Sequence, residues 1–352
     1  MKHLKSSNSK IIIVEDISFP IDEGIKKYSF NIASFFSNQK EGVVYTHQNN
    51  NDLNKQYQLT RNKLFLSRPF LKSLKNRNGN VVYVPNSSST FASFLRLKIV
   101  KFFTKKKTVL ISLQKRNHSN WQRKIISIFL KPDLLFVFSE REKDYYASLK
   151  IKTEITSVGV NVEKFNEVTQ ENKTKLRAKL GLSLDKKIVC HVGHINEGRN
   201  IKILKELVAL NYEVVIIGST CFDDDETLKN ELKAAGVKVV TDYIESICEY
   251  YQVLDAYIFP VLNDNSVIEF PLSILEAMSC NIPVLSTAFG SIPHYFKESD
   301  DFKYFNTKEE LIFKMDELFA QNNLDKCMNR ERIVKDFTWV SQFEKLNDRI
   351  IN

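Results

Sequence analysis

Hydrophobic residues in the first half of the chain form short runs that alternate with amphipathic stretches. The runs are rich in β-branched and aromatic residues, as strands are, and lie at residues 10–16, 41–47, 79–86, 107–114, 132–140 and 152–160. Stretches between them, such as 23–38 and 119–131, place apolar residues at i, i+3 and i+4, which is typical of helices. This alternation predicts a parallel sheet with helices on both faces.

The second half repeats the rhythm with more uniformly apolar runs. These runs lie at 186–193, 212–219, 237–243, 255–262 and 282–287. Nearly continuous apolar runs are expected of strands buried on both faces of a parallel sheet. Helices are predicted between them at 199–211 and 225–236, with Gly236 as a left-handed C-cap. We therefore predict an α/β protein made of two tandem, Rossmann-like, doubly wound domains.

The length supports two domains, because a chain of 352 residues exceeds the ~250 to 300 at which single cores stop growing. The polar stretch Asn166–Lys175 interrupts the alternation. We predict a first domain over 1–165, a linker over 166–176 and a second domain over 177–337. In doubly wound sheets, ligands bind at the carboxyl ends of the strands, so the residues just after each strand are the candidates for function.

The net charge of +9 is distributed unevenly. Residues 1–160 carry +17 and residues 161–352 carry −8. From Arg61 to Leu130 there are 16 basic residues and no acidic one, interleaved with apolar residues that include Trp121. Such a segment favours anionic lipid headgroups or phosphorylated substrates. Nucleic acid is disfavoured because no nucleic-acid module accompanies the charge, and a solvated basic face without a specific partner stays open.

No apolar run approaches the ~18 to 20 residues of a membrane-spanning helix, and the first ten residues lack the apolar centre of a signal peptide. We therefore expect a cytoplasmic protein. The five cysteines have no CxxC spacing, which argues against structural zinc and a disulfide framework. We expect them to be reduced and mostly buried.

The stretch SVIEFPLSILEAMSC, residues 266–280, contains two glutamates around a proline. Pro271 suits the first position of a helix, and Phe270 before it is pushed towards an extended conformation. Glu269 should therefore lie in the loop, and Glu276 on the helix. Helical side chains lean towards the N-terminus, so Glu276 can reach the space in front of the helix, where free backbone N–H groups bind phosphate. A phosphate-bearing ligand with a neighbouring diol would suit both features.

The segment FPLSILEAMSCNIPVLST resembles the nucleotide-sugar signature of retaining glycosyltransferases of the GT-B fold, family 4. Other segments resemble the same family in the same order: DEGIKK, GVNVEKF, HVGHINEGRN, EYYQVLDAYIFPV and FTWVSQFEKLNDRI. The resemblance spans nearly the whole chain. It implies that the two domains face each other across a crevice, and that a terminal helix at about 338–352 crosses back onto the first domain.

The family's E-x7-E pattern implies roles for the two glutamates. Its second glutamate, which accepts hydrogen bonds from the donor ribose, falls on Glu276. Its first, which lies near the transferred sugar, falls on Ile268, so Glu269 stands one residue late. Either Glu269 takes that place through a local backbone shift, or the role is vacant. The implied donor contacts also include the start of the helix: Phe270, Pro271, Leu272 and Ser273.

The segment VGHINEGRN resembles the family's G-R-x4-K element, whose cations neutralise the donor diphosphate. Gly193 precedes it, His194 falls on the arginine position and Arg199 on the lysine position. A guanidinium can bind a leaving diphosphate through two hydrogen bonds, a task that a metal ion performs elsewhere. His194 is the weaker cation near neutral pH, and it could instead only pack in the crevice.

Other implied positions are less specific. Gly24 resembles the family's glycine at the crevice, although a plain turn glycine would look the same. His118 lies near where the family carries a histidine beside the transferred sugar, but the usual place is closer to Gln114, so a surface-loop role stays open. The base and ribose are expected to dock at strand ends that include Gly218, Ser219, Tyr243 and Ile244.

The acidic run DDDE, Asp223 to Glu226, invites comparison with metal-binding elements of other glycosyltransferases. Acidic residues also favour the start of a helix, and we prefer that reading. No metal site is predicted.

Taken together, the resemblance implies a metal-independent, retaining enzyme without a cofactor. It would transfer a sugar from a UDP- or GDP-sugar to an acceptor hydroxyl, in surface polysaccharide or glycolipid assembly on a lipid-linked acceptor at the inner face of the membrane. Its catalytic residues would be Arg199, Glu269 and His118. Two alternatives remain: a nucleotide-sugar 2-epimerase, and a non-catalytic subunit that binds nucleotide sugars.

Overall fold

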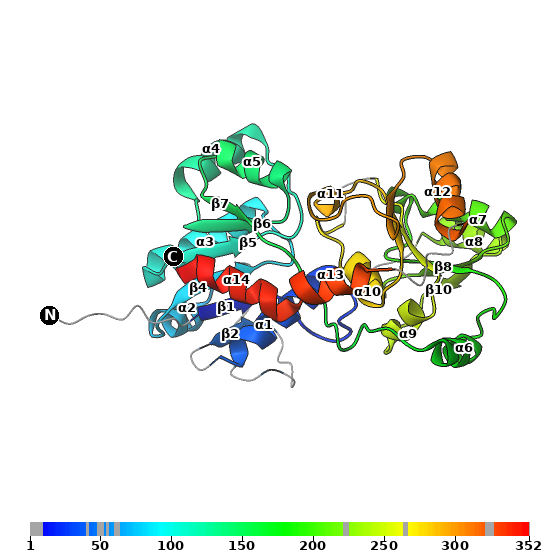
Figure 1. The fold of residues 1–352 in the computed structure, drawn as a ribbon. Coiled ribbons are helices and arrows are strands. Elements are labelled where there is room, and N and C mark those ends of the chain that lie inside the picture. Colours follow the sequence, from blue (N-terminus) through cyan, green and yellow to red (C-terminus); the bar gives the residue numbers. More distant parts are fainter. Residues whose placement is uncertain are drawn as a thin grey trace. The chain divides into compact units, whose positions relative to one another are not determined.

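The structure is a computed structural model, described here for residues 10–39, 42–47, 53, 56–59, 64–220, 225–262, 267–320 and 327–351. The chain divides into two compact units, each considered by itself (Figure 1). The first consists of Met1–Ser157, Ser266–Phe270 and Gln342–Asn352. The second consists of Val158–Asn265 and Pro271–Ser341.

The first unit is built on a seven-stranded sheet with the order β3-β2-β1-β4-β5-β6-β7, in which all described pairs are parallel. Its strands are β1 (Lys10–Val14), β2 (Val43–Thr46), β3 (Gln56–Gln58), β4 (Asn80–Val84), β5 (Thr108–Ile111), β6 (Leu134–Val137) and β7 (Thr153–Ile155). The apolar runs at 10–16, 79–86, 107–114 and 132–140 are fully buried where they form strands, apart from Asn80. This is the burial expected of a sheet covered on both faces.

Helices follow the strands of the first unit. They are α1 (Gly24–Ser37), α2 (Arg68–Lys75), α3 (Phe91–Thr104), α4 (Asn120–Phe129), α5 (Glu140–Ser148) and, from Gln342 onward, α14 (Trp339–Ile351). The ring of Phe343 in α14 packs on Tyr28 and Phe35 of α1, with centroids 5.6 and 5.5 Å apart. The last helix thus contributes Phe343 to the core of the first unit.

The second unit has a parallel, six-stranded sheet with the order β10-β9-β8-β11-β12-β13. Its strands are β8 (Ile188–Val192), β9 (Glu213–Ile217), β10 (Lys238–Val240), β11 (Ala256–Phe259), β12 (Val284–Ser286) and β13 (Phe302–Tyr304). The helices are α6 (Gln170–Lys179), the 3-10 helices η1 (Glu197–Arg199) and η2 (Ile201–Lys205), α7 (Glu206–Ala209), α8 (Glu226–Ala234), α9 (Ile247–Gln252), α10 (Leu272–Ser279), α11 (Ile292–Tyr295), α12 (Lys308–Ala320) and α13 (Asn329–Asp336).

Both sheets are doubly wound, which confirms the predicted α/β class. In each, the strand order reverses at one place, between β1 and β4 in the first unit and between β8 and β11 in the second. Ligands of such sheets bind beyond the carboxyl ends of the strands at these switch points. The loops after these four strands are therefore where a site is expected.

The boundary between the units differs from the prediction. The chain enters the second unit at Val158, and most of the stretch predicted as a linker is α6. Most of this helix is exposed, so its polar sequence resembled a linker. Its buried Arg177 pairs with Asp255 at 2.7 Å, and Lys173 pairs with the same carboxylate at 3.1 Å. These two pairs fix α6 to the residue before β11.

Among the described residues, no helix is long and apolar enough to cross a membrane. Four cysteines are free thiols, and the fifth, Cys221, lies outside the described residues. Burial raises the pKa of the Cys190 and Cys280 thiols.

Candidate functional site

Glu276 lies in α10, the helix that follows the switch-point strand β11. Pro271 is the N-cap with an extended backbone (φ −65°, ψ 122°), so the helix begins at Leu272, one residue later than predicted. Most of the α10 side chains are buried, and Glu276 is only 4% exposed. Glu276 is therefore a buried residue of α10 and not part of its exposed surface.

A buried carboxylate needs a hydrogen-bond donor, and Tyr251 of α9 supplies one. The Tyr251 hydroxyl donates to Glu276 Oε2 at 2.9 Å. Tyr251 is fully buried, and burial and the neighbouring Glu276 raise its pKa well above the usual value, so it stays a donor. Sequence reasoning missed Tyr251, because nothing in the local pattern distinguishes it from a core aromatic residue.

The loop after β8 is shaped by Gly193. Its backbone N–H donates to the carbonyl of Ile217 at 3.0 Å, which continues the pairing with β9. A Cβ atom at this position would come within 3.0 Å of His191 Nε2 and 3.3 Å of Arg199 Nη1. Only glycine lets these two side chains approach the backbone so closely.

Arg199 ends the short helix η1 and is buried. Asn200, in the left-handed region with φ 54°, turns the chain after it, and its side chain donates to the carbonyl of Pro260 at 3.2 Å. Pro260 directly follows β11. This hydrogen bond ties the loop after β8 to the end of β11, so Arg199 is held at the switch point of the sheet.

His191 is a residue that the sequence analysis did not place in the site. Its Nδ1 lies 3.0 Å from the carbonyl of Ile258 and therefore carries the proton that it donates. Burial, together with nearby Arg199, lowers the pKa of His191 to about 3, so the ring is neutral near neutral pH. Nε2 is a buried acceptor beside Gly193, without a hydrogen-bond partner among the described residues.

His194 is half-buried and lies in the loop after β8. Its assignment as a diphosphate-binding cation stays a prediction. Gly218 follows β9 and donates to the carbonyl of Val240 at 2.8 Å. Since β8, β9 and β10 are neighbours, the positions predicted for base and ribose share one sheet edge with Gly193: Gly218, Ser219, Tyr243 and Ile244.

The segment Ser266–Phe270 belongs to the first unit. Its described part contains Ile268 and Glu269, the two residues at which the sequence departs from the family pattern. Ile268, at the position where the resemblance implies a glutamate, packs on Gly24 at the start of α1. A Cβ atom at Gly24 would come within 3.0 Å of Ile268 Cδ1. An apolar contact therefore occupies this place, and Gly24 is required for close approach rather than for a positive φ.

Glu269 is 2% exposed. Its backbone N–H donates to the carbonyl of Leu113 at 2.9 Å, and its Oε1 lies 3.3 Å from Nη2 of Arg141 in α5. The neighbouring Glu142 is fully buried, and burial and the charge of Glu269 raise its pKa well above the usual value. Two carboxyl groups and one guanidinium thus lie together at the carboxyl end of the first sheet.

His118 is fixed by both ring nitrogens. Nδ1 lies 3.0 Å from the Tyr145 hydroxyl, and Nε2 lies 2.9 Å from the carbonyl of Ser89, to which it donates. Burial lowers the pKa of His118. Gln114, nearer to the family's usual place, is buried and next to Leu113, the partner of Glu269. A catalytic role for His118 stays a prediction.

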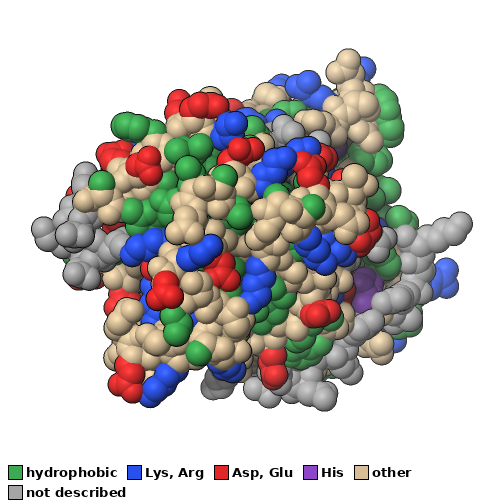
Figure 2. Space-filling view, turned by 90° about the vertical axis from the view of Figure 1, so that its right-hand side faces the viewer, with side chains coloured by type: hydrophobic (Ala, Val, Ile, Leu, Met, Phe, Trp, Pro, Cys, Tyr) green, Lys and Arg blue, Asp and Glu red, His purple; other side chains and the backbone are tan. Residues whose placement is uncertain are grey.

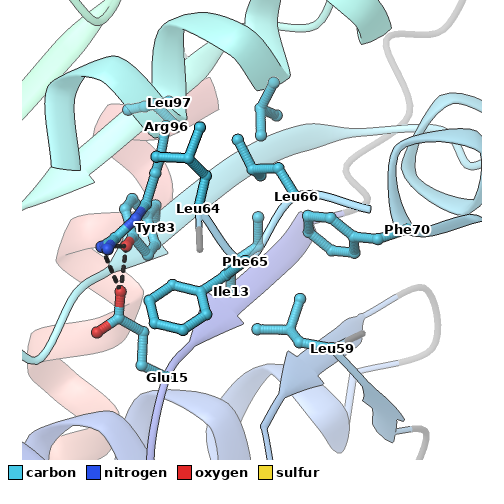
Figure 3. A pocket seen from close by; sticks show the side chains of 11 residues that line it. Ile13, Glu15, Leu59, Leu64, Phe65, Leu66, Phe70, Tyr83, Arg96 and Leu97 are labelled. Carbon is cyan, nitrogen blue, oxygen red and sulfur yellow. Dashed lines mark hydrogen bonds and ion pairs between the residues drawn. The ribbon is translucent and has the colours of Figure 1, made fainter. Parts of the chain in front are cut away.

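A small apolar cavity lies near the switch point of the first sheet (Figure 3). Its volume is about 20 Å³, room for about one water-sized group. At one end Glu15, which follows β1, accepts hydrogen bonds from the Tyr83 hydroxyl and from Arg96. This polar cluster ties β1, β4 and α3 together.

No group of three or more histidine, cysteine or acidic side chains that could hold a metal ion occurs in the described part of the chain. Asp223 and Asp224 lie outside it. Asp225 caps α8 by accepting from the backbone N–H of Leu228 at 3.0 Å, and Glu226 lies in the first turn. For these two residues, the helix-start reading is confirmed.

Comparison with protein families gives a match to Glycosyl transferases group 1 over residues 172–333. The putative teichuronic acid biosynthesis glycosyltransferase TuaC of Bacillus subtilis is 23% identical over 147 residues, 40% of this chain and 35% of that protein. The alpha-galactosylglucosyldiacylglycerol synthase of Streptococcus pneumoniae is 28% identical over 137 residues, 36% of this chain and 35% of that protein. The chain thus matches about a third of the length of each.

Solved structures resemble the chain over nearly its full length. A crystal structure of Anabaena Alr3699/HepE in complex with UDP has a TM-score of 0.76 at 13% identity and covers 97% of this chain and 99% of that one. A glycosyltransferase from Rickettsia africae has a TM-score of 0.79 at 15% identity, covering 98% and 99%. At these identities the likeness establishes the two-domain GT-B fold.

Proposed function

Because residues 172–333 match the family model of glycosyl transferases group 1, we propose that this chain transfers a sugar from a nucleoside diphosphate donor to an acceptor hydroxyl, with retention of anomeric configuration. One observation carries the proposal. Glu276, within the segment that the family model matches, is a buried carboxylate held by Tyr251 near the start of a helix at the switch point. This arrangement suits a ligand that combines a diol with a diphosphate.

In this proposal, Glu276 accepts hydrogen bonds from the donor ribose. The free N–H groups at the start of α10, Leu272 to Ile274, bind diphosphate oxygens. Arg199 supplies the positive charge that stabilises the departing diphosphate, so the reaction proceeds without a metal ion. A UDP-sugar is the favoured donor, because the similar Anabaena structures hold UDP or UDP-glucose.

Retention follows from reaction on one face of the sugar. The acceptor oxygen forms its bond to the anomeric carbon on the side from which the diphosphate leaves, and the acceptor proton passes to a donor phosphate oxygen. Little enzymic general base is then required. Glu269, held by Arg141, would orient the transferred sugar, although it occupies a different place from the glutamate that the family pattern implies.

For the acceptor we propose a lipid-linked saccharide in surface polysaccharide or glycolipid assembly, on the inner face of the cytoplasmic membrane. The names of the two bacterial relatives, one in teichuronic acid biosynthesis and one a glycolipid synthase, support this class.

A second candidate is a non-catalytic subunit that binds nucleotide sugars. It is favoured by one observation, the apolar contact between Ile268 and Gly24 at the position where a glutamate is implied. Such a subunit would bind donor tightly without consuming it.

The test combines a donor panel with product analysis. Thermal shift and calorimetry with UDP, GDP and their sugars should identify one nucleotide that binds, and incubation with that donor and acceptor lipids should yield glycosylated product. Glu276→Ala should weaken donor binding at least about ten-fold, the loss of charge-assisted hydrogen bonds. Glu226→Ala, an exposed helix-start glutamate in the same unit, is the control.

Unchanged donor affinity in Glu276→Ala would refute the site. Tight binding without turnover would favour the non-catalytic subunit. Interconversion of 2-epimeric donors would favour an epimerase.

A further inference from the structure

The surface of α3 and α4 carries large apolar side chains among many basic residues. Five large apolar side chains of these helices are more than half exposed: Phe102, Phe103, Trp121, Ile128 and Phe129. The sequence from Arg61 to Leu130 contains no acidic residue to offset its lysines and arginines. Scattered apolar residues are normal on a protein surface, but a cluster rimmed by one sign of charge indicates an interaction surface.

These side chains lie along two neighbouring helices. In α4, Trp121, Lys124 and Ile128 have i, i+3, i+7 spacing and are all exposed, so they form one outward ridge. At the helix starts, the Trp121 ring packs on Phe91 of α3 with centroids 5.2 Å apart. Near the helix ends, Lys101 of α3 lies 2.6 Å from Asp133, which follows α4. The two helices therefore run side by side.

Lysines surround the apolar residues at the helix ends. Lys105 and Lys107 follow α3 and are exposed, and Lys131 follows α4. Lys105 Nζ lies 4.8 Å from the centre of the exposed Phe102 ring. Cations at helix C-termini are explained by the helix dipole, but the dipole gives no reason for Phe102 and Phe129 to be 62% exposed beside them.

A groove beside α4 adds two further cations, Arg123 and Lys150, to Lys124 of the ridge. Its volume is about 370 Å³, and it is lined by Arg123 and Lys124 of α4 and Lys150 after α5, with Ser127 and Ser148 offering hydroxyl groups. This is room enough for a phosphate-bearing headgroup, and the lining is rich in hydrogen-bond donors for one.

We infer that this α3–α4 face, defined by the five exposed apolar residues and the lysines around them, docks onto an anionic lipid bilayer. Aromatic side chains insert at the headgroup boundary while lysines contact lipid phosphates, the pattern of interfacial amphipathic helices. A second copy of the chain is the poorer occupant, because two such faces would bring like charges together. The inference deepens the proposed function by locating its membrane contact.

The ridge of α4 also fixes how the first unit would lie on the lipid. The ridge extends from Trp121, in the first turn of α4 after the loop that follows β5, to Ile128, in the last turn of α4 ahead of β6. A bilayer along the whole ridge would lie alongside β5 and β6 and would reach the level of their carboxyl ends. His118, two residues before α4, would then be near the headgroups, where the saccharide of a lipid-linked acceptor is presented.

The second unit offers an internal contrast. The face in Figure 2, on the side of α7, α8 and α12, mixes acidic and basic side chains. Phe313 of α12 is 65% exposed, as much as Phe102, but its helix contains Glu309, Glu310, Asp316 and Glu317. An equally exposed phenylalanine in acidic surroundings should not dock onto anionic lipid.

The test uses the intact chain and its tryptophans. The chain has two, so Trp339→Phe leaves Trp121 as the single reporter. With phosphatidylglycerol vesicles, the Trp121 emission should shift to shorter wavelength and be quenched by brominated lipid, and high salt should reverse both effects. Phosphatidylcholine vesicles should give neither. Free glycerol phosphate, which carries the charge without the bilayer, should also give neither.

Two double variants then separate the contribution of apolar insertion from that of positive charge. Phe102→Ser combined with Phe129→Ser, and Lys105→Glu combined with Lys107→Glu, should each lower the vesicle partition coefficient at least about ten-fold. Phe313→Ser should leave it unchanged. Each variant must keep the wild-type melting temperature and nucleotide affinity, which shows that it folds and that donor binding is independent of docking.

No salt-sensitive binding of the wild type, or equal binding to neutral vesicles, would overturn the inference. Vesicle binding that stays unaltered in both double variants would also overturn it. Sedimentation that shows a concentration-dependent dimer covering the α3–α4 face would have the same consequence. Loss of docking with donor binding intact would leave the proposed function standing. Docking without any glycosyl transfer would refute only the function.

Discussion

Nη2 of the half-exposed Arg141 lies 3.3 Å from Oε1 of the buried Glu269. The guanidinium reaches water and the carboxylate does not. Burial and the charge of Glu269 raise the pKa of Glu142, a second buried carboxyl group close by. The position of Glu269 therefore depends on a residue 128 positions earlier in the chain.

Replacing Arg141 should expose this dependence. Arg141→Met leaves Glu269 buried without its cation and should lower the free energy of unfolding by about 1–3 kcal/mol, measured by urea denaturation. Arg141→Lys, which keeps the charge, should recover much of the loss. Lys143→Met on the same helix serves as control, because Lys143 pairs with the exposed Glu140 in a surface ion pair. A wild-type unfolding free energy in Arg141→Met would mean that the ion pair does not hold Glu269.

Gly193 should be intolerant of a methyl group. In Gly193→Ala, the Cβ atom would press on Nε2 of His191 and on Arg199, and the fully buried imidazole cannot retreat. Arg199 must then shift, so affinity for the nucleoside diphosphate should fall about ten-fold by calorimetry, the effect of losing about one good charge-assisted hydrogen bond. Gly198→Ala is the matched control, because its Cβ would meet only the end of the Asn196 side chain. Equal affinities in the two variants would argue against Arg199 as a diphosphate ligand.

The buried His191 predicts loss of stability in acid. Its folded pKa is about 3, whereas the unfolded histidine has its usual value near 6.5. Between these two pH values the unfolded state binds a proton that the folded state does not. The free energy of unfolding therefore falls as the pH drops below about 6.5, and His191 contributes up to about 1.4 kcal/mol of this loss per pH unit. Above that pH the contribution is constant.

His191→Asn keeps a donor for the Ile258 carbonyl but does not titrate. Its free energy of unfolding, measured in urea at pH 7, 6 and 5, should approach that of the wild type as the pH falls. A difference that stays constant over this range would show that His191 does not have the depressed pKa.

Tyr251 should act on donor binding only through Glu276. Tyr251→Phe removes the donor to Glu276 Oε2 while keeping the ring that packs on Phe165. Affinity for the nucleotide-sugar donor should fall roughly five- to thirty-fold, which corresponds to a loss of about 1–2 kcal/mol in binding free energy. In a double-mutant cycle with Glu276→Gln, the two losses should not add. Additive losses would assign Tyr251 an independent role.

Much of the fold is predictable because its signals are local. Continuous apolar runs mark strands β1, β4, β5 and β6, and a proline marks the start of α10 within one residue. Helix α6 was missed because an exposed helix and a linker share a polar composition. Strand β3, with the sequence QYQ, was missed for the same reason, since its residues are half-buried or exposed.

The candidate site was only partly predictable, because its partners come from distant parts of the sequence. The resemblance indicated Glu276 and Arg199, but nothing local pointed to Tyr251 or His191 as their neighbours. The pairing of Ile268 with Gly24 likewise joins the two halves of the chain. Sequence spacing exposed the missing glutamate, and only the structure shows an apolar contact in its place.

The placement of Phe343 on Tyr28 and Phe35 sets an order of events during synthesis. A ribosome completes all strands of the first sheet by residue 155, but the segments 266–270 and 342–352 of the same unit emerge nearly two hundred residues later at the farthest. Until then the aromatic surface of α1 has no cover, which is a condition that favours chaperone binding. The unit that begins first is therefore finished last, and a fragment ending at Ser157 would expose the same surface permanently.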